Sequence, residues 1–427
     1  MPSLVVRAFL VFFAAEYLVE TALLLLNLRR AARSGGQVPP PLAGLVEAEA
    51  AARSRAYTLA NGRLALVSGA FSAVFTLAVL LSGLLPALDR ALAARGLGGA
   101  HRFVAFLALV AILFSLFGLP FSLYRTFVIE ARFGFNRTTF RLWLADHLKG
   151  LLVSAALGLP LLYAVYGFMA LTGRGWWLWL AGFLTAVQVL MVWLWPAFVA
   201  PLFNRFAPLP EGPLKERLEA LAEAARFRTR GLFVMDASRR SGHGNAYFTG
   251  FFRPRIVLFD TLVERMTVPE AAAVLAHEIG HYQRRHVHKR LALGVLGQLV
   301  TLWVLSLLVP WPPLYRAFGF AAPSYQVALA LFAIGGGAFT FFLAPLASWL
   351  SRRHEYEADR YSAALVPEPG ALASALTKLN AENLANLDPH PWYSAWHYSH
   401  PTLVERLRAL GAPRPGAGLA TDAVDRL

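Results

Sequence analysis

Two histidines and a glutamate are spaced in a way that can hold a metal ion and carry out acid–base chemistry. His277, Glu278 and His281 form an H-E-x-x-H run within residues 271–288. Residues four apart lie on one face of an α-helix, so both imidazoles can reach one metal ion. The glutamate then faces the open metal position, where it can accept a proton from water. We therefore expect a zinc hydrolase site with Glu278 as general base, rather than a helix with two surface histidines.

The helix that carries this motif has a predicted start. Thr267 followed three residues later by Glu270 is a capping box, in which the hydroxyl and the carboxylate satisfy backbone N–H groups at the helix N-terminus. No glycine or proline separates His281 from Leu293. We therefore expect the motif helix to continue without a break into the next apolar span, which would put the metal near the membrane surface or within the helix bundle.

A catalytic zinc site usually needs a third protein ligand. The longer motif H-E-x-x-H-x-x-G-x-x-H does not supply it, because Arg284 and Val287 occupy the last two defining positions. His288 lies about two helical turns beyond His281, too far for the same ion. We therefore expect His286 and His288 to be surface or second-site residues.

The remaining source of a ligand is the end of the last apolar span, residues 351–359 (SRRHEYEAD). Glu355 and Asp359 are four residues apart and share a helical face. This arrangement suits one metal ligand and one supporting carboxylate, with Asp359 holding a ligating histidine by its other ring nitrogen. His354 is an alternative ligand.

The composition is that of a membrane protein. The chain has 427 residues, of which 57% are hydrophobic and 15% charged, with a mean hydropathy of +0.50. A soluble domain usually has about a quarter charged residues. The absence of cysteine excludes disulfides and thiolate metal sites. The net charge of +15 would suggest nucleic-acid binding in a soluble protein, but here we assign it to basic cytoplasmic loops and expect no nucleic-acid partner.

Seven stretches are long and apolar enough to cross a bilayer, which takes about 20 residues. They are residues 4–28, 64–85, 103–123, 151–171, 176–203, 291–310 and 325–350. Arginine and lysine concentrate in the odd-numbered connections between them. By the positive-inside rule, the N-terminus lies outside, and the motif segment and the C-terminus lie in the cytoplasm.

The first span carries Glu16 and Glu20 on one face. We expect this span to be retained rather than cleaved as a signal peptide, because no small-residue cleavage site follows it. Charged residues within a span face a bundle interior or water. The pair therefore either lines a polar cavity, or Glu20 pairs with a neighbouring helix, and the sequence does not decide between these alternatives.

The main soluble part is expected between the fifth and sixth spans. Residues 210–227 predict an amphipathic helix, and residues 231–236, 245–252 and 255–260 predict short strands. The expected fold class is an all-α multi-pass membrane protein of about seven transmembrane helices with a small α+β, zincin-like cytoplasmic protease domain. The expected divisions are a five-span membrane region (1–203), a cytoplasmic metalloprotease segment with the motif helix (204–290), spans six and seven (291–350), and a C-terminal cytoplasmic region with the third ligand (351–427).

Several runs of the sequence, taken in order, resemble the integral-membrane zinc metalloproteases of the CAAX prenyl endopeptidase type. Besides the motif helix, these runs are EARFGFNRTT (130–139), PLFNRFAPLPEGPLK (201–215), SGHGNAYFTGF (241–251), RIVLFDTL (255–262), SRRHEYEAD (351–359) and SHPTLVERL (399–407). The resemblance implies a seven-helix bundle around a large water-filled chamber, with one zinc ion at its cytoplasmic end.

The resemblance also implies roles for particular residues. Glu278 would be the base, and the zinc ligands would be His277, His281 and Glu355. An edge strand beginning at Asn245 would pair with an extended substrate, and His400 and Arg406 would lie near the scissile carbonyl and the substrate.

The substrate is less constrained. Eukaryotic members of this family process prenylated C-terminal CAAX motifs, whereas this chain is rich in Ala, Leu, Arg and Gly and carries no endoplasmic-reticulum retention signal. It resembles a bacterial member, expected in the plasma membrane with its active site towards the cytoplasm. Its substrate would be a lipidated or membrane-associated peptide or protein, or a target of membrane-protein quality control without a prenyl requirement. A transporter would explain the spans but not H-E-x-x-H together with E-x-x-x-D.

Overall fold

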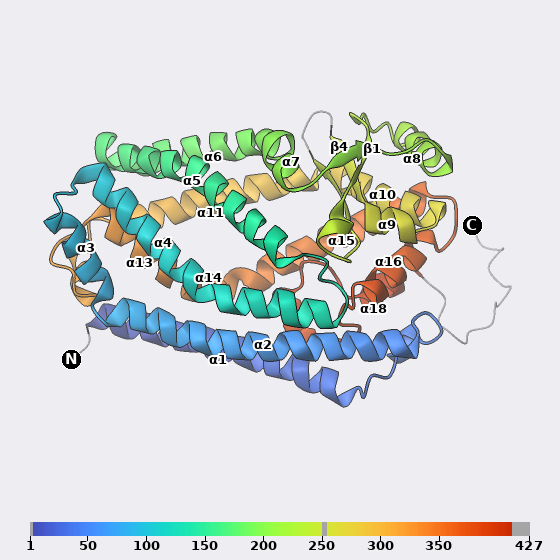
Figure 1. Cartoon of the computed structure of the whole chain (residues 1–427), viewed down its shortest axis with the longest axis horizontal. Coiled ribbons are helices and arrows are strands. Elements are labelled where there is room, and N and C mark those ends of the chain that lie inside the picture. The colour runs from blue at the N-terminus through green and yellow to red at the C-terminus, as the bar shows by residue number, and fades with distance from the viewer. Residues whose placement is uncertain (1–2, 250–253, 412–427) are drawn as a thin grey trace, which may run out of the picture.

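Apolar stretches of the sequence form long helices that run along much of the molecule (Figure 1). The computed structural model describes residues 3–249 and 254–411. Within that part of the chain, six helical spans are long and apolar enough to cross a membrane. They are α1 (Leu4–Arg33), α2 (Ala48–Leu81), α4 (Gly99–Tyr124) with a π-helical extension (Arg125–Glu130), α5 (Phe140–Leu171), α6 (Trp176–Leu194) continuing through a π-helical segment (Trp195–Val199) into α7 (Ala200–Phe203), and α11 (His286–Leu308).

A broken helix pair forms a seventh candidate span. The helix α13 (Tyr325–Gly335) and the helical segment Gly337–Leu365 are apolar enough together, and they are bent by 41° relative to each other. The second segment contains α14 (Gly337–Thr340) and α15 (Ala344–Leu365). The predicted all-α multi-pass fold is confirmed. The helices extend beyond the apolar stretches because polar residues continue the helical backbone outside the span.

The remaining helices are shorter, and most of them lie at the two ends of the bundle. The far end, opposite the sheet, has α3 (Leu84–Ala94) and α12 (Pro312–Ala317). The rest are α8 (Pro213–Ala224), α9 (Asp260–Arg265), α10 (Val268–Gln283), α16 (Ala371–Glu382), α17 (Pro391–His397) and α18 (Leu403–Ala409). The start of α1 and the helices α8 to α10 therefore lie at opposite ends of the molecule (Figure 1).

A small mixed sheet lies beside the helix that carries the motif. Its strands are β1 (Phe206–Pro208), β2 (Leu232–Met235), β3 (Ala246–Thr249) and β4 (Arg255–Phe259), in the order β1-β2-β4-β3. Strands β2 and β4 are parallel, and the other two pairs are antiparallel. The three predicted strands are present, although residues 250–252 of the second prediction lie outside the described residues. Strand β1 was not predicted, and β3 is an edge strand of the described sheet.

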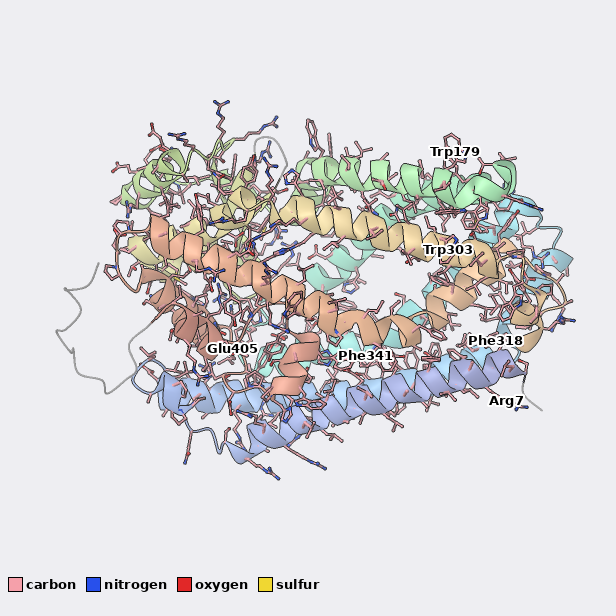
Figure 2. The ribbon with its side chains drawn as sticks, turned by 180° about the vertical axis from the view of Figure 1, so that it is seen from behind. Arg7, Trp179, Trp303, Phe318, Phe341 and Glu405 are labelled. Atoms are coloured by element: carbon pink, nitrogen blue, oxygen red, sulfur yellow. The ribbon has the colours of Figure 1, made fainter. Side chains whose placement is uncertain are left out.

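Buried apolar side chains gather at the two ends of the molecule. One core joins α8, α10, α16 and the sheet, and it includes Leu218 and Ile279. The other joins α3, α4 and α12, and it includes Leu85, Phe103 and Tyr315. Figure 2 shows these ends through two labelled residues, with Phe318 at one end and Glu405 towards the other. The bundle is therefore held together at its ends.

The middle of several spans contributes nothing to either core. Helix α5 buries only Val165 and Met169, both near its far end. Helix α6 buries only Trp176, Leu180 and Ala181 in its first two turns, while Trp179 is exposed on the outer side (Figure 2). A helix in a solid bundle buries one face along its whole length. The tight packing of these two spans is therefore confined to the end of the molecule opposite the sheet.

The first span makes a polar contact with the C-terminal region. Glu20 Oε2 of α1 lies 3.2 Å from His397 Nε2 of α17. Of the two alternatives for the acidic pair in this span, pairing with a neighbouring helix is therefore the one observed for Glu20.

The motif helix begins as predicted but ends earlier. The capping box of Thr267 and Glu270 is present at the start of α10. The prediction of an unbroken helix into the next span is wrong, because α10 ends at Gln283 and α11 begins at His286. Arg285 between them has a left-handed backbone with φ of 55°. This conformation is rare for a residue with a β-carbon. An arginine at this position of the sequence therefore does not indicate that a helix ends there.

Candidate metal centre

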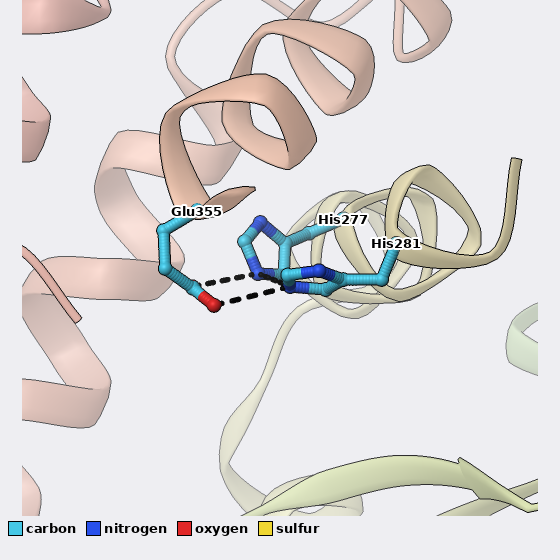
Figure 3. Close-up of side chains that lie close together, drawn as sticks. All are labelled: His277, His281 and Glu355. Carbon is cyan, nitrogen blue, oxygen red and sulfur yellow. Dashed lines mark hydrogen bonds and ion pairs between the residues drawn. The ribbon is translucent and has the colours of Figure 1, made fainter. Parts of the chain in front are cut away.

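The three predicted ligands converge where α10 meets α15 (Figure 3). One ligand atom from each of His277, His281 and Glu355 lies within 4.8 Å of the other two, and all three residues are buried. The two Nε2 atoms are 3.1 Å apart. Each lies 3.3 Å from an oxygen of Glu355. Ligand atoms of a tetrahedral zinc ion with bonds of about 2.1 Å are separated by about 3.4 Å, so this spacing fits zinc.

The chemistry of the donor set also fits. Two imidazole nitrogens and one carboxylate are a common ligand set of catalytic zinc, and they leave one position for water. His277 Nδ1 lies 2.8 Å from Asp359 Oδ1, which places its proton on Nδ1 and turns the Nε2 lone pair towards Glu355. His354, the alternative ligand, is not part of this group. Its ring stacks on His286 with centroids 4.1 Å apart.

Small residues allow α10 and α15 to approach closely enough to form this group. A β-carbon on Gly280 would lie 3.1 Å from Ala358 Cα and 3.1 Å from Tyr361 Cβ, which is tighter than ordinary contact. One turn further along α15, Ser362 Oγ donates a hydrogen bond of 2.7 Å to the Ala273 carbonyl. The glycine inside the motif is therefore needed for helix packing, which brings the carboxylate of one helix to the histidines of the other.

A buried ion pair lies behind the ligands. Arg406 Nε donates to Asp359 Oδ2 at 2.8 Å, and its Nη2 bonds the other oxygen of the same carboxylate. The same Nη2 lies 3.4 Å from His277 Nδ1. Both members of the pair are buried, and Arg406 is not among the residues that line the cavity in front of the ligands. Its position does not support the predicted contact of Arg406 with the substrate.

A cavity of about 810 Å³ opens in front of the ligands. It is lined by the three ligands, by Glu278 and His400, by residues 245–249 along the edge strand, and by side chains of α6 and the π-helical segment that follows it. The apolar ones among the latter are Val187, Met191, Val192, Trp195 and Pro196. The structure therefore brings the predicted base, the predicted edge strand and His400 to one space beside the metal ligands.

The predicted positions of His400 and Asn245 are compatible with substrate contact. His400 Nδ1 lies 2.7 Å from Glu355 Oε2, and about two thirds of its side chain is exposed, at 63%. Asn245 is exposed and stands directly before the edge strand. Its carbonyl accepts a hydrogen bond of 3.0 Å from the Phe259 N–H, which fixes the start of β3.

The electrostatics of the site favour a cation. Burial alone would lower the pKa of His277, but the carboxylates of Asp359 and Glu355 raise it to about 9. The site therefore favours positive charge beside His277, which a metal dication supplies. Burial also raises the pKa of Glu278, and this effect outweighs the lowering by His277 and His281. A raised pKa makes a carboxylate a stronger proton acceptor, as a general base requires.

Two neighbours of the site were missed or misplaced from the sequence. His286, expected at the surface or in a second site, is fully buried, and its Nδ1 lies 2.9 Å from His281 Nδ1. The surface interpretation is therefore wrong for this residue. Arg290 lines the cavity, with Nη2 3.8 Å from Glu355 Oε1. The density of histidines just after the motif was the only sequence signal for His286, and nothing marked Arg290.

Comparison with known proteins shows the family to which this chain is similar. A family model described as CAAX prenyl protease N-terminal, five membrane helices, matches residues 27–205, and Peptidase family M48 matches residues 208–414. A rice protein named CAAX prenyl protease 1 homolog is 38% identical over 413 residues, covering 95% of this chain and 96% of that protein. CAAX prenyl protease 1 of Saccharomyces cerevisiae is 39% identical, covering 72% and 71%.

A solved structure and a human protein give the same result. The crystal structure of Ste24p from Saccharomyces mikatae superposes with a TM-score of 0.88 at 32% identity, covering 94% of this chain and 98% of that one. The human CAAX prenyl protease 1 homolog is 33% identical, covering 94% of each chain. These relatives are eukaryotic, so the expectation of a bacterial member in a bacterial plasma membrane has no support among them.

Proposed function

Because this chain belongs to the CAAX prenyl protease family of M48 zinc metalloendopeptidases, we propose that Glu278 is the general base of peptide-bond hydrolysis. The observation that carries the proposal is the position of Glu278, which adjoins His277 and lines the same cavity as the three zinc ligands. Glu278 is a carboxylate beside the proposed zinc position that is not itself one of the three ligands. Its raised pKa supports the same role.

In the proposed reaction, His277, His281 and Glu355 hold the zinc ion. When bound, zinc acts as a Lewis acid that lowers the pKa of water to about 7 and polarises the substrate carbonyl. Glu278 takes a proton from the attacking water and later gives it to the amine that leaves. His400, whose Nδ1 faces Glu355, would donate a hydrogen bond from Nε2, with both ring nitrogens protonated, to the oxygen of the scissile carbonyl as charge develops there.

The substrate is proposed to bind as an added strand. Among the described residues, strand β3 (Ala246–Thr249) lies at the edge of the sheet, with β4 as its partner, and its residues line the cavity. An extended peptide pairs with such an edge through main-chain hydrogen bonds, which suits a protease because the scissile bond is held in line with the backbone. Asn245 stands at the end of this edge and would orient the peptide beside the ligands.

We place Asp359 and Arg406 in supporting roles. Asp359 accepts from His277 Nδ1 and so fixes the direction in which that imidazole presents its lone pair. Arg406 holds Asp359 through two hydrogen bonds and does not line the cavity.

The proposed substrate class is supported by the relatives, which are named CAAX prenyl proteases. We assign to this chain protein substrates that end in a prenylated C-terminal segment. The apolar wall of the cavity on α6 offers a surface for apolar side chains of that segment. The basic odd-numbered connections between the spans, together with the position of the protease end opposite the start of α1, support an active site that faces the cytoplasm.

A cleavage assay on purified protein tests both activity and substrate. Matched peptides with and without a farnesyl group on the C-terminal cysteine are incubated with the enzyme, each with and without a zinc chelator. We expect chelator-sensitive cleavage, faster with the farnesylated peptide. Equal rates on both peptides would instead favour a quality-control protease without a prenyl requirement, and chelator-resistant cleavage would contradict the zinc mechanism.

A further inference from the structure

His286, the first histidine after the motif, is part of a hydrogen-bonded chain that ends on a metal ligand. His286 is fully buried, and its Nδ1 lies 2.9 Å from Nδ1 of the ligand His281. On the other side of the same ring, Nε2 lies 3.1 Å from Glu357 Oε2 of α15. The chain therefore runs from the carboxylate of Glu357 through His286 to His281, and it is separate from the pair formed by Asp359 and His277.

The geometry fixes where the protons lie. A carboxylate only accepts hydrogen bonds, so His286 Nε2 carries a proton and donates it to Glu357. In the neutral ring, His286 Nδ1 is then an acceptor. His281 must consequently carry its own proton on Nδ1 and donate it to His286. This assignment leaves the lone pair of His281 on Nε2, the atom that faces Glu355 and His277.

The break between α10 and α11 makes this contact available. On one continuous helix, residues five apart point about 140° away from each other, so His286 would face away from His281. The left-handed Arg285 redirects the chain, and α11 starts with His286 turned back towards the ligands. The strained residue thus has a consequence for the metal site.

Neighbouring groups hold both members of the chain. The ring of His354 stacks on His286 with centroids 4.1 Å apart and an angle of 14° between the planes. Glu357 is oriented by Arg353 at 3.5 Å and Lys289 at 4.0 Å. These contacts come from both α11 and α15. The hydrogen-bonded chain therefore connects the start of α11 to the part of α15 that carries the ligand Glu355.

We infer that His286 and Glu357 are positioning residues, which set the tautomer of His281 so that its Nε2 is free to ligate. The two ligating histidines would then be oriented by separate carboxylates, His277 directly by Asp359 and His281 through His286 by Glu357. The inference rests on the zinc site of the proposed function. The two are tested separately, because stoichiometric zinc in the unmodified chain tests the site and the variants below test the orientation of His281.

The test measures metal affinity rather than turnover. Full-length protein in detergent is stripped of metal, and its zinc affinity is measured by competition with a chromophoric chelator. His286→Phe keeps an aromatic ring that can stack but removes the acceptor, and we expect zinc affinity to fall by about 10- to 100-fold. His286→Asn puts an amide oxygen near the former Nδ1 position and should recover most of the loss. The control is His354→Phe, which keeps an aromatic ring against His286 and lies outside the ligand group, and it should bind zinc like the unmodified chain.

Two further variants keep the inference testable if the aromatic replacement does not fold. Glu357→Leu lets His286 move its proton to Nδ1, which would force His281 to turn its own proton towards the metal. Its zinc affinity should fall, whereas Glu357→Gln, which retains an acceptor oxygen, should stay within a few-fold. Cobalt-loaded protein should show altered visible absorption bands in the Phe and Leu variants only. Unchanged zinc affinity in Glu357→Leu, or equal losses in His286→Phe and His286→Asn, would overturn the inference.

Discussion

Gly280 of α10 packs against Ala358 of α15 so closely that a β-carbon at position 280 would lie 3.1 Å from the Ala358 Cα. The obstructing atoms belong to backbone and to the base of a side chain, so they cannot move out of the way alone. This contact lies one residue before His281 and three residues after Glu355 along their helices. The separation of the two helices at this point therefore sets the separation of the zinc ligands.

Gly280→Ala should loosen the metal site. The added methyl group must push the two helices apart by a few tenths of an ångström, and overpacking of this kind costs about 1–3 kcal/mol of folding free energy. We expect a lower thermal midpoint and weaker zinc binding, measured by thermal unfolding in detergent and by chelator competition.

Gly294→Ala is the matched control for that substitution. Gly294 also lies inside a helix, α11, and a β-carbon there would meet no atom within 4 Å. The alanine should leave zinc affinity unchanged and, by helix propensity, should be neutral or stabilising by up to about 1 kcal/mol. Equal effects of the two substitutions would show that close packing at position 280 is not what holds the ligands together.

Glu278→Gln should separate metal binding from catalysis. Glutamine has nearly the same size but cannot accept the proton of the attacking water, and general-base catalysis contributes about 10²- to 10⁴-fold to rate. We expect one zinc per chain by elemental analysis and a loss of cleavage in that range or beyond. His277→Ala, in contrast, should lose both zinc and cleavage. Substantial cleavage by the Gln variant would mean that another group is the base.

Local patterns in the sequence predicted much of this structure. The spans follow from runs of apolar residues, and the pairing of His277 with His281, and of Glu355 with Asp359, follows from a spacing of four residues on a helix. The capping box at Thr267 was equally local. Each of these features depends on residues close together in the chain, where helical periodicity alone decides which side chains share a face.

The features that the sequence did not reveal depend on contacts between distant segments. The helix break at Arg285 has no glycine or proline, so only the packing of α11 against the rest of the molecule explains it. The burial of His286 follows from that break, and its partner Glu357 lies 71 residues away. Arg406, 47 residues from Asp359, reached its place behind the ligands through α18, whose packing no periodic pattern specifies.

The proposed orientation in the membrane can be tested by labelling. The chain has no cysteine, so each introduced cysteine is the only reactive thiol. In sealed membrane vesicles with the cytoplasmic face outward, Glu211→Cys, at a side chain that is 85% exposed near the sheet, should react with a membrane-impermeant maleimide. Arg174→Cys, in the exposed connection between α5 and α6, should react only after the vesicles are permeabilised. The opposite pattern of labelling would reverse the orientation.

The cap of the motif helix should make stability depend on pH. Burial alone would raise the pKa of Glu270, but hydrogen bonds from the Thr267 backbone, Ser374 and Lys378 lower it below its ordinary value of 4.5. A depressed pKa in the folded state gives stabilisation that is present above the unfolded pKa and lost as pH falls through the folded pKa.

Glu270→Gln should therefore reduce the acid sensitivity of the protein. The amide has no proton to gain, so the fall in thermal midpoint between pH 6 and pH 4 should be smaller in this variant than in the unmodified chain. At pH 6 the variant should be the less stable of the two, because it has lost the charged bond to Lys378, whose Nζ lies 3.0 Å from Glu270 Oε2. Identical pH dependence in the two proteins would mean that Glu270 is not part of the acid response.

Variants of the buried pair Asp359 and Arg406 can separate the effect of Asp359 on the orientation of the ligand His277 from its effect on folding. Removing one partner of a buried ion pair leaves an uncompensated charge and costs about 3–5 kcal/mol, whereas replacing both can be nearly neutral. Asp359→Asn alone should therefore lower the thermal midpoint sharply and weaken zinc binding. Adding Arg406→Met removes the stranded cation while keeping an apolar stem, so the double variant should regain much of the thermal stability. Its zinc affinity should stay low, since His277 Nδ1, 2.8 Å from Asp359 in the native site, still lacks its charged acceptor. Recovery of zinc affinity together with stability would show that Asp359 acts on the site only through folding.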